Sequence, residues 1–225
     1  MVRENFIIAI DGFSSCGKST VAKALAKKLN FVFVDSGAMY RAVTLYFLRN
    51  AINCSDTATV QEALNNIHID FIPNTEKTQI LLNGEDVSDE IRQMEVSEMV
   101  SEVSAIKEVR KAMVAQQQQL GARRNIVMDG RDIGTTVFPD ADLKIFMTAD
   151  PLIRANRRLA ELLAKGETVT LEEVIENLAH RDHIDSTREE SPLRQASDAI
   201  VVDNSHMTQE EQLELVLNEY QSRLK

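Results

Sequence analysis

The residues with the clearest chemical meaning form one short loop near the N-terminus. The segment GFSSCGKST, residues 12–20, matches G-x-x-x-x-G-K-[S/T] and lies between an apolar run and a helical pattern. Glycines in such a loop let backbone N–H groups surround phosphate oxygens, and the dipole of the following helix adds to the attraction. Lys18 is expected to reach the β- and γ-phosphates of ATP or GTP, and Ser19 to approach Mg²⁺ directly or through a water. The residues expected to bind the nucleotide are Gly12, Phe13, Ser14, Ser15, Cys16, Gly17, Lys18, Ser19 and Thr20.

Cys16 lies inside this loop and allows two interpretations. A helix N-terminus and the ammonium group of Lys18 can lower the pKa of a nearby thiol, which would make Cys16 reactive. Alternatively, the thiol is a small neutral side chain that fills a loop position, and we favour this second interpretation. If the thiol is exposed and reactive, bound ATP should slow its alkylation.

Arginine side chains are the second group with chemical meaning. Arginine supplies 15 of the 25 basic residues, and its planar guanidinium group suits phosphate and carboxylate ligands. Any single arginine could instead form a solvated surface ion pair. Many of them nevertheless lie near helix starts, in loops or beside aspartate: Arg41, Arg92, Arg110, Arg131, Arg154, Arg157, Arg158, Arg181 and Arg188. Together they favour small anionic ligands.

The combination favours phosphoryl transfer and leaves open whether the acceptor is itself a phosphate. Such a transfer depends on positioning and on neutralising charge. An acceptor phosphate is largely ionised near neutral pH, because its second pKa is about 6, so that no general base is required. Consistently, none of the four histidines lies in a motif typical of a catalytic base.

The composition limits the partners. The chain of 225 residues carries a net charge of −10, so it should repel nucleic-acid polymers. Its length fits one domain with a modest insertion. No apolar run approaches the roughly 18 residues that span a bilayer, and residues 1–6 are too few and too polar for a secretory signal. We therefore expect a cytoplasmic protein without a membrane partner, and its two cysteines fit a reducing compartment.

Alternating strand and helix patterns must position the loop and the arginines. Phe6–Ile10 is a short apolar run, Thr20–Leu29 has helical spacing, and Phe31–Val34 is a second apolar run. A strand–loop–helix–strand opening predicts a parallel α/β fold. Further elements of this series are expected at 42–48, 125–128, 143–147, 152–164, 171–180, 199–202 and 209–224.

The middle of the chain departs from this series. His68–Ile72 and Gln79–Leu82 look like short strands, with a turn-like segment at Pro73–Lys77 between them. The dipeptide Asn83-Gly84 that follows is a hairpin signal. We therefore expect a small antiparallel insertion at about 63–89.

A long helical pattern follows the insertion. Ile91–Gln119 is predicted as helix, and its apolar stripe includes Met94, Met99, Val103 and Ile106.

Other classes of protein with such a loop fit less well. A GTPase switch would carry an N-K-x-D motif, which the sequence lacks, and a nucleic-acid motor would be larger and more basic. A small kinase fits better. A kinase for another anionic metabolite, such as shikimate, and a nucleotide-dependent regulatory module without turnover remain as alternatives.

Five segments together resemble the bacterial cytidylate kinases (CMP kinases). They are the phosphate-binding loop, DSGAMYR, LLNGEDVSDEIR, DGRDIGTTVFPDADLKIFMTA and RDHIDSTRE, and the resemblance runs from about Ile7 to the final helix. It implies transfer of phosphate from Mg²⁺·ATP to CMP or dCMP. It also implies the fold of P-loop nucleoside monophosphate kinases, in which a parallel sheet is flanked by helices. A monophosphate-binding insertion would span about 63–100 and a short mobile lid about 152–168.

The same resemblance assigns the acceptor site. Ser36, Gly37, Tyr40 and Arg41 would hold the acceptor phosphate together with Arg131 and Arg188, although a plain Ser-capped helix start would use the same N–H groups. Asp132 would accept from the exocyclic amine of cytosine, while Arg110 and Ser101 donate to the ring acceptors. Arg181 and Asp185 would meet the sugar. Arg92, Asp129 and Gly130 complete the expected acceptor site.

The expected catalytic residues are cationic. They are Lys18, Arg131, Arg154, Arg157 and Arg158, of which the last three lie in the lid region and would close over the triphosphate. Asp129 suits an indirect role in Mg²⁺ binding, or could orient Arg131 or Lys18. Many members of the family have proline at the position of Phe13 and glycine at that of Ser19, so Ser19 is not an indispensable Mg²⁺ ligand. We expect a monomer.

Overall fold

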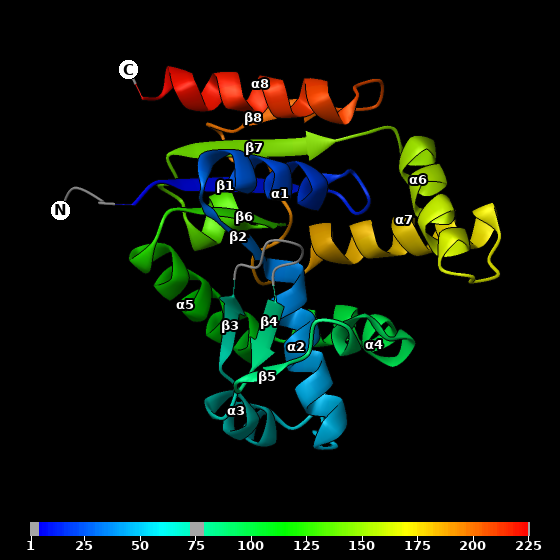
Figure 1. Ribbon diagram of the computed structural model, residues 1–225. Coiled ribbons are helices and arrows are strands. Elements are labelled where there is room, and N and C mark those ends of the chain that lie inside the picture. The colour runs from blue at the N-terminus through cyan, green and yellow to red at the C-terminus, as the bar shows by residue number, and fades with distance from the viewer. Residues whose placement is uncertain (1–4, 73–78, 225) are drawn as a thin grey trace.

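A five-stranded parallel sheet forms the centre of the protein. A computed structural model describes residues 5–72 and 79–224, and its large sheet has the order β2-β6-β1-β7-β8 (Figure 1). The strands are β1 (Ile7–Gly12), β2 (Val32–Asp35), β6 (Ile126–Gly130), β7 (Leu143–Thr148) and β8 (Ile200–Asp203). Every neighbouring pair is parallel. The predicted parallel α/β fold is therefore confirmed.

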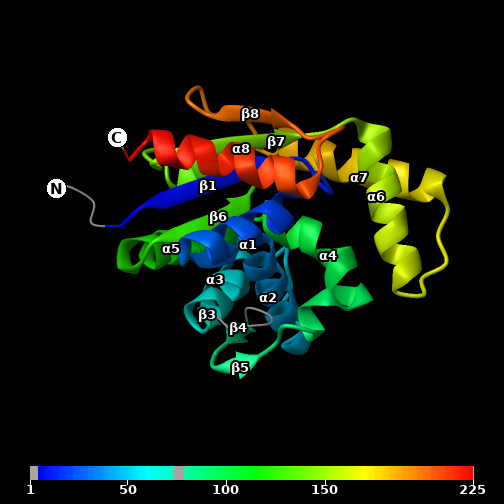
Figure 2. The ribbon, with the colours of Figure 1, turned by 45° about the horizontal axis from the view of Figure 1, so that its top comes forward.

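Helices cover both faces of this sheet because its central strand is apolar on both sides. Ile8 and Ile10 of β1 pack in one cluster with α1 (Lys18–Leu29) and α8 (Gln209–Ser222). Ile7 and Ala9 face the opposite side, where α2 (Ser36–Arg49) and α5 (Lys107–Arg123) lie. Alternate residues of a strand point to opposite faces, so a continuous apolar run is typical of a strand buried on both sides. The arrangement of the helices around the sheet can be followed in Figure 2.

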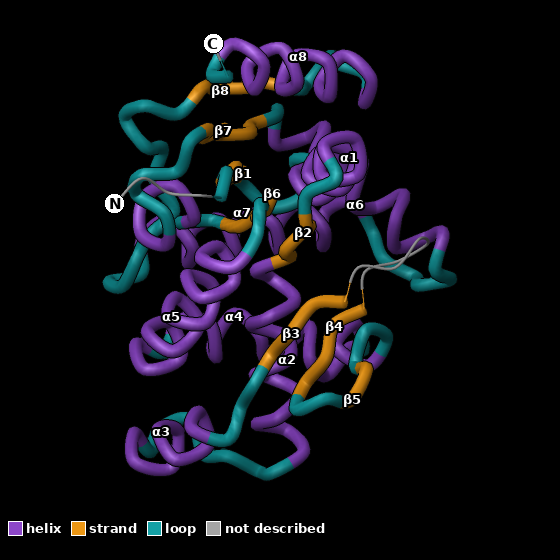
Figure 3. Tube along the Cα trace, turned by 60° about the vertical axis from the view of Figure 1, so that its left-hand side comes forward, coloured by secondary structure: helices purple, strands orange, loops and turns teal. Residues whose placement is uncertain are grey.

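The predicted antiparallel insertion is also confirmed. After α3 (Thr57–Asn65), the strands β3 (Ile69–Ile72), β4 (Gln79–Leu82) and β5 (Glu85–Asp86) form a separate three-stranded sheet (Figure 3). Asn83 and Gly84 connect β4 to β5 with φ values of 51° and 86°, the left-handed conformation that a tight hairpin turn requires at both positions. The predicted turn at Pro73–Lys77 lies outside the described residues.

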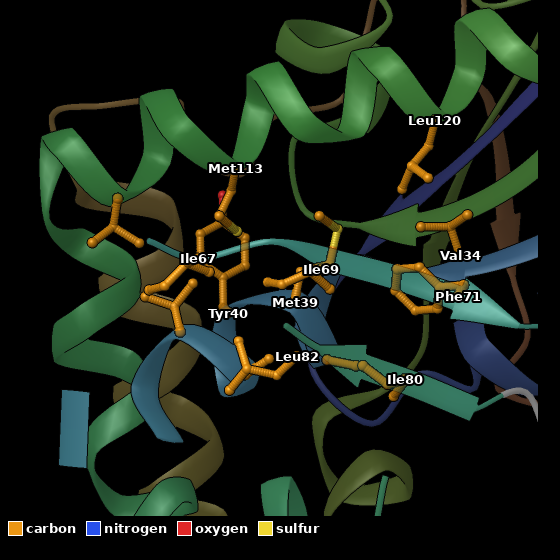
Figure 4. Packing of buried hydrophobic residues seen from close by; sticks show 14 of the residues in the cluster. Val34, Met39, Tyr40, Ile67, Ile69, Phe71, Ile80, Leu82, Met113 and Leu120 are labelled. Carbon is orange, nitrogen blue, oxygen red and sulfur yellow. The ribbon is translucent and has the colours of Figure 1, made fainter. Parts of the chain in front are cut away.

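The small sheet belongs to the main core. Ile69 and Phe71 of β3 and Ile80 and Leu82 of β4 are buried in the same cluster as α2 and α5. Figure 4 shows Ile69 beside Met39 and Phe71 beside Val34, within the same cluster. The insertion is thereby fixed against the helix that begins with DSGAMYR.

The prediction of one helix over Ile91–Gln119 is wrong. The segment contains a short 3₁₀ turn at Glu90–Arg92, α4 (Met94–Ala105) and α5. Ile106 separates the two helices with φ −67° and ψ 125°, yet Val103 before it and Val109 after it are both buried, so the apolar spacing continues across the break. Met94 is 60% exposed, because it is the first residue of α4 and projects away from the core that Val103 joins.

Two helices project from the carboxyl edge of the large sheet (Figure 1). They are α6 (Pro151–Ala164) and α7 (Leu171–Thr187), which share a small apolar cluster formed by Ala155, Val174 and Leu178. Helix α7 continues to Thr187, beyond the predicted end at residue 180. The prediction ended too early because RDHIDST, which forms the last turns, carries almost no apolar pattern. No helix in the described part of the chain is both long enough and apolar enough to cross a membrane.

Gly121 provides a test of how tightly the core is packed. A Cβ atom on this α5 residue would lie 2.6 Å from the ring of Phe138, which is 5% exposed, and 3.2 Å from Ile7. Alanine would gain about 1 kcal/mol of helix propensity but incur about 1–3 kcal/mol of overpacking. We expect Gly121→Ala to lower the free energy of unfolding by up to about 2 kcal/mol in chemical denaturation. Exposed Gln119→Ala in the same helix is the control, and a stabilised Gly121→Ala protein would contradict the packing described here.

Candidate active site

A cavity of about 300 Å³ opens where β1, β2 and β6 end. In parallel sheets, ligands bind at this edge because the loops that follow neighbouring strands meet there. One side is lined by the phosphate-binding loop and the other by the start of α2, the end of α4 and the last turns of α7. The lining residues are Ser14, Ser15, Gly17, Lys18, Ser19, Thr20, Asp35, Ser36, Gly37, Tyr40, Arg41, Val100, Ser101, Ser104, Arg110, Asp129, Gly130, Arg131, Asp132, Arg158, Glu161, Arg181, Asp185 and Arg188.

The phosphate-binding loop is shaped by two glycines. Gly12 pairs with Met147 in the sheet at φ 148°, and a Cβ there would lie 2.0 Å from the Met147 carbonyl oxygen. Gly17 precedes α1 at φ 86°. Lys18 Nζ donates to the carbonyl oxygen of Phe13 at 2.6 Å. Its burial, with the nearby charge of Arg131, lowers the pKa of Lys18.

Three residues of the loop do not face the cavity. Besides Gly12, these are Phe13, whose ring packs against Phe146, and Cys16, which is completely buried. The Cys16 thiol donates to the Phe13 carbonyl oxygen at 3.0 Å. The interpretation of Cys16 as a small side chain that fills the loop therefore holds, and that of an exposed reactive thiol is wrong.

Asp129 lies between the loop and the acceptor side. Its Oδ2 accepts from the Ser19 hydroxyl at 2.6 Å, while Oδ1 is buried with no hydrogen-bond partner among the residues described. Asp35 pairs with Asp129 in the register of β2 and β6. Burial, together with the charge of Asp35, raises the pKa of Asp129 to about 7.

The acceptor side contains a chain of alternating arginines and aspartates. Arg110 Nη2 donates to Asp132 Oδ2 at 2.6 Å, and Arg188 Nη2 is 3.6 Å from Asp132 Oδ1. Arg188 also contacts Asp185 at 3.2 Å, and Asp185 in turn accepts from Arg131 Nε at 2.7 Å. We call these five residues the Arg–Asp chain. Because Arg110 and Asp132 are almost fully buried, each neutralises a charge that would otherwise be costly to bury.

Arg41 and Arg181 also line the cavity, close to other positive charges. Burial lowers the pKa of both, and Arg131 and Arg41 add repulsion at Arg181, bringing its pKa to about 10. The Nε atom of Arg41 has no hydrogen-bond partner in the part of the chain that the structure describes. An anion between them would relieve this repulsion, so this end of the cavity suits a phosphate.

The first turn of α2 does not have the serine cap that the sequence allowed as an alternative to an anion site. Asp35, not Ser36, is the N-cap: its side chain accepts from the N–H of Ala38 at 2.9 Å. The Ser36 hydroxyl instead donates to the Asp129 carbonyl oxygen at 2.6 Å. Ser36 thus ties α2 to β6, while Gly37, Tyr40 and Arg41 line the cavity.

Three of the predicted arginines lie outside the cavity. Arg92 is exposed after β5. Arg154 is buried against Asp182 and the carbonyl oxygen of Ser14, and Arg157 donates to Asn204. Of the lid arginines, Arg158 lines the cavity, and its Nη1 lies 3.3 Å from Glu161.

Asp11 fixes the turn that presents Asp132. Its carboxylate accepts from the N–H groups of Ile133 at 2.8 Å and Gly134 at 2.7 Å, at the start of the π-helical turn Ile133–Val137. Burial raises the pKa of Asp11 to about 6, although the two hydrogen bonds act to lower this pKa. The sequence analysis missed Asp11, Asp35 and Asp182, although Asp11 directly precedes the phosphate-binding loop, Asp35 begins DSGAMYR and Asp182 lies within RDHIDSTRE.

Comparison with known proteins gives the family. A family model described as cytidylate kinase matches residues 8–222. The chain belongs to the cytidylate kinase family. A cytidylate kinase of Bacteroides fragilis is 57% identical over 223 residues, covering 97% of each chain, and one of Cytophaga hutchinsonii is 55% identical over 217 residues, covering 96% of this chain and 93% of its own. An uncharacterized protein from Eubacterium ventriosum has a crystal structure with a TM-score of 0.53 and 13% identity, covering 97% of this chain and 99% of its own, which shows a shared fold.

The raised pKa of Asp11 predicts a pH dependence of stability. Because the folded-state pKa of about 6 exceeds the ordinary value of 3.8, the protonated carboxyl favours folding. Its contribution is complete below about pH 4 and is lost as the pH rises to about 6, by about 3 kcal/mol at 1.36 kcal/mol per pKa unit. The difference in unfolding free energy between the wild type and Asp11→Asn should change by this amount between pH 4 and 7. A difference that is constant with pH would contradict the assignment.

Proposed function

We propose that this protein transfers the γ-phosphoryl group of ATP to CMP or dCMP, giving ADP and CDP or dCDP. The observation that carries the proposal is one cavity with a phosphate-binding loop at one side and the Arg–Asp chain at the other. A donor triphosphate on the loop and an acceptor phosphate at Arg41, Arg131 and Arg188 would then approach each other within this cavity.

On the donor side, backbone N–H groups of the loop and the start of α1 would hold the β- and γ-phosphates, and Lys18 would reach the phosphates from its position beside the Phe13 carbonyl oxygen. Ser19 and Asp129 fit a divalent cation, because Asp129 presents one buried oxygen without a partner and has a raised pKa that a cation would lower. Asp35 is the neighbour of Asp129 in the register of β2 and β6. Mg²⁺ bound there would neutralise charge on the phosphates.

On the acceptor side, Asp132 has the chemistry to select cytosine. Arg110 holds its Oδ2, and its lone pairs would accept from the exocyclic amine, while Arg110 and Ser101 donate to the ring acceptors. Uracil would place its O4 against the carboxylate and be repelled. Arg181 and Asp185 would contact the sugar, and Ser36, Gly37, Tyr40, Arg131 and Arg188 would help Arg41 to hold the phosphate.

The chemistry would need charge neutralisation and water exclusion, without a general base. Residues 152–168 would act as the lid that brings Arg158 over the phosphates, and 63–100 as the monophosphate-binding region. Arg154 and Arg157 would reach a nucleotide only if α6 left its present contacts. A cytoplasmic monomer remains our prediction. A kinase for a non-nucleotide acid is less well supported, because such an acceptor needs no buried carboxylate that reads an amine.

The direct test couples ADP release to an indicator reaction with CMP, dCMP, UMP and AMP compared side by side. Cytosine monophosphates should give the highest kcat/KM. No turnover with either cytosine nucleotide would refute the proposed function.

Asp132→Asn tests the reading of the base. The amide keeps the shape but offers an N–H donor to O4 of uracil, so the preference for CMP over UMP should narrow by about tenfold or more, given about 1–3 kcal/mol for such a contact. The ratio of kcat/KM values measures it, with exposed Glu102→Gln in α4 as the charge-matched control. An unchanged ratio would remove Asp132 from base recognition.

Arg41→Ala tests the acceptor phosphate site. Loss of one cation at the developing charge should lower kcat/KM for CMP by about 100-fold. The calorimetric affinity for a non-hydrolysable ATP analogue should stay within about threefold, a change below 1 kcal/mol. Arg49→Ala is the matched control, because Arg49 lies on the same helix but pairs with Glu85 and Glu90 at the surface. Turnover of CMP at the wild-type rate would place Arg41 outside the site.

A further inference from the structure

Ser14 is the point where the phosphate-binding loop meets the helices α6 and α7. Its N–H donates to Asp182 Oδ1 at 3.2 Å, and its carbonyl oxygen accepts from Arg154 Nη1 at 3.1 Å. Its hydroxyl accepts from Arg131 Nη2 at 2.9 Å. Every polar group of Ser14 is thus bound by a side chain from outside the loop.

The same peptide unit that meets Asp182 also holds the loop lysine. The carbonyl oxygen of Phe13 accepts from Lys18 Nζ at 2.6 Å, and the N–H on the other side of this peptide bond is the one that Asp182 accepts. A trans peptide is planar, with its C=O and N–H pointing in opposite directions. Holding the N–H therefore fixes the direction of the carbonyl group, and with it the place where the lysine ammonium rests.

Lys18 depends on this acceptor. Its side chain is buried, and burial together with Arg131 lowers its pKa, so an ammonium group without an acceptor there would be costly. If the Phe13–Ser14 peptide turned over, the carbonyl oxygen would leave Lys18 and the Ser14 N–H would leave Asp182.

Asp182 is itself held in place. Its side chain is 14% exposed, and its Oδ2 pairs with Arg154, which is 8% exposed. Arg154 also donates to the carbonyl oxygen of Ala149 and lies over the Phe13 ring at 5.3 Å. Asp182 does not line the cavity, although Arg181 and Asp185 on the same helix do. It is therefore placed to act on the loop and not on a bound nucleotide.

We propose that Asp182 is a positioning residue for ATP: by holding the Ser14 N–H and Arg154, it sets the orientation of the Phe13–Ser14 peptide and so the position of Lys18. The inference rests on the proposed function only in taking ATP as the phosphate donor. It assigns Arg154 to the same task, in place of a direct contact with phosphate.

The test compares the effect of Asp182 substitutions on ATP binding with their effect on the KM for CMP. Asp182→Ala removes the acceptor of a buried N–H, which costs about 1–3 kcal/mol, so KM for ATP and the calorimetric Kd of a non-hydrolysable ATP analogue should rise about tenfold or more. KM for CMP should change less than about twofold, under 0.5 kcal/mol. Asp182→Asn retains an oxygen for the Ser14 N–H but loses the charge on Arg154, and should lie between Asp182→Ala and the wild type.

Glu176→Gln, an exposed carboxylate on the same helix, is the control and should leave both substrates unaffected. Unchanged affinity of Asp182→Ala for the ATP analogue, or equal increases in both KM values, would overturn the proposal. Calorimetry with the ATP analogue needs no acceptor. If the wild type bound the analogue without turning over CMP, the proposed function would fail, while weaker binding by Asp182→Asn and Asp182→Ala would still uphold the role of Asp182.

Discussion

The burial of several guanidinium groups in one cleft is the constraint on which the site depends. A buried charge is tolerated only when it is paired and hydrogen-bonded. The Arg–Asp chain meets this condition from Arg110 to Arg131 by alternating the sign of the charge. Arg41 and Arg181 stand outside the alternation, with lowered pKa values, and so provide the attraction for an anion.

The fold serves this arrangement by bringing distant segments to one edge of a sheet. The parallel register places Asp35 beside Asp129, and the turn after β6 carries Arg131 and Asp132. Helix α7 supplies Asp185 from the opposite side of the cleft. The charges of each segment are therefore neutralised by partners from other segments.

The sequence could predict what depends on local pattern. The loop, the strand–loop–helix–strand succession at the start of the chain and the Asn83-Gly84 hairpin follow from residue types and spacing. The resemblance to a family supplied residues that the structure brings to one cavity, from Ser36 to Arg188. It could not predict tertiary choices. The break at Ile106 leaves the apolar spacing intact. The last turns of α7 lack an apolar pattern, and their charged contacts are with Arg131 and Asp132 in the turn that follows β6. The ion pair between Arg154 and Asp182 connects α6 and α7 to the phosphate-binding loop. No local sequence pattern encodes the relative position of these three elements.

The pairing of Gly12 with Met147 limits how the loop can respond to a ligand. Because that backbone contact leaves no room even for a methyl group, the entrance of the loop cannot shift without breaking the sheet. Its exit is fixed as well, since α1 begins at Lys18. Adaptation is confined to the residues 13–17, a span so short that closing it around a triphosphate sacrifices little chain entropy. The residues that can adjust to a nucleotide thus lie between the end of β1 and the start of α1, two elements packed into the core.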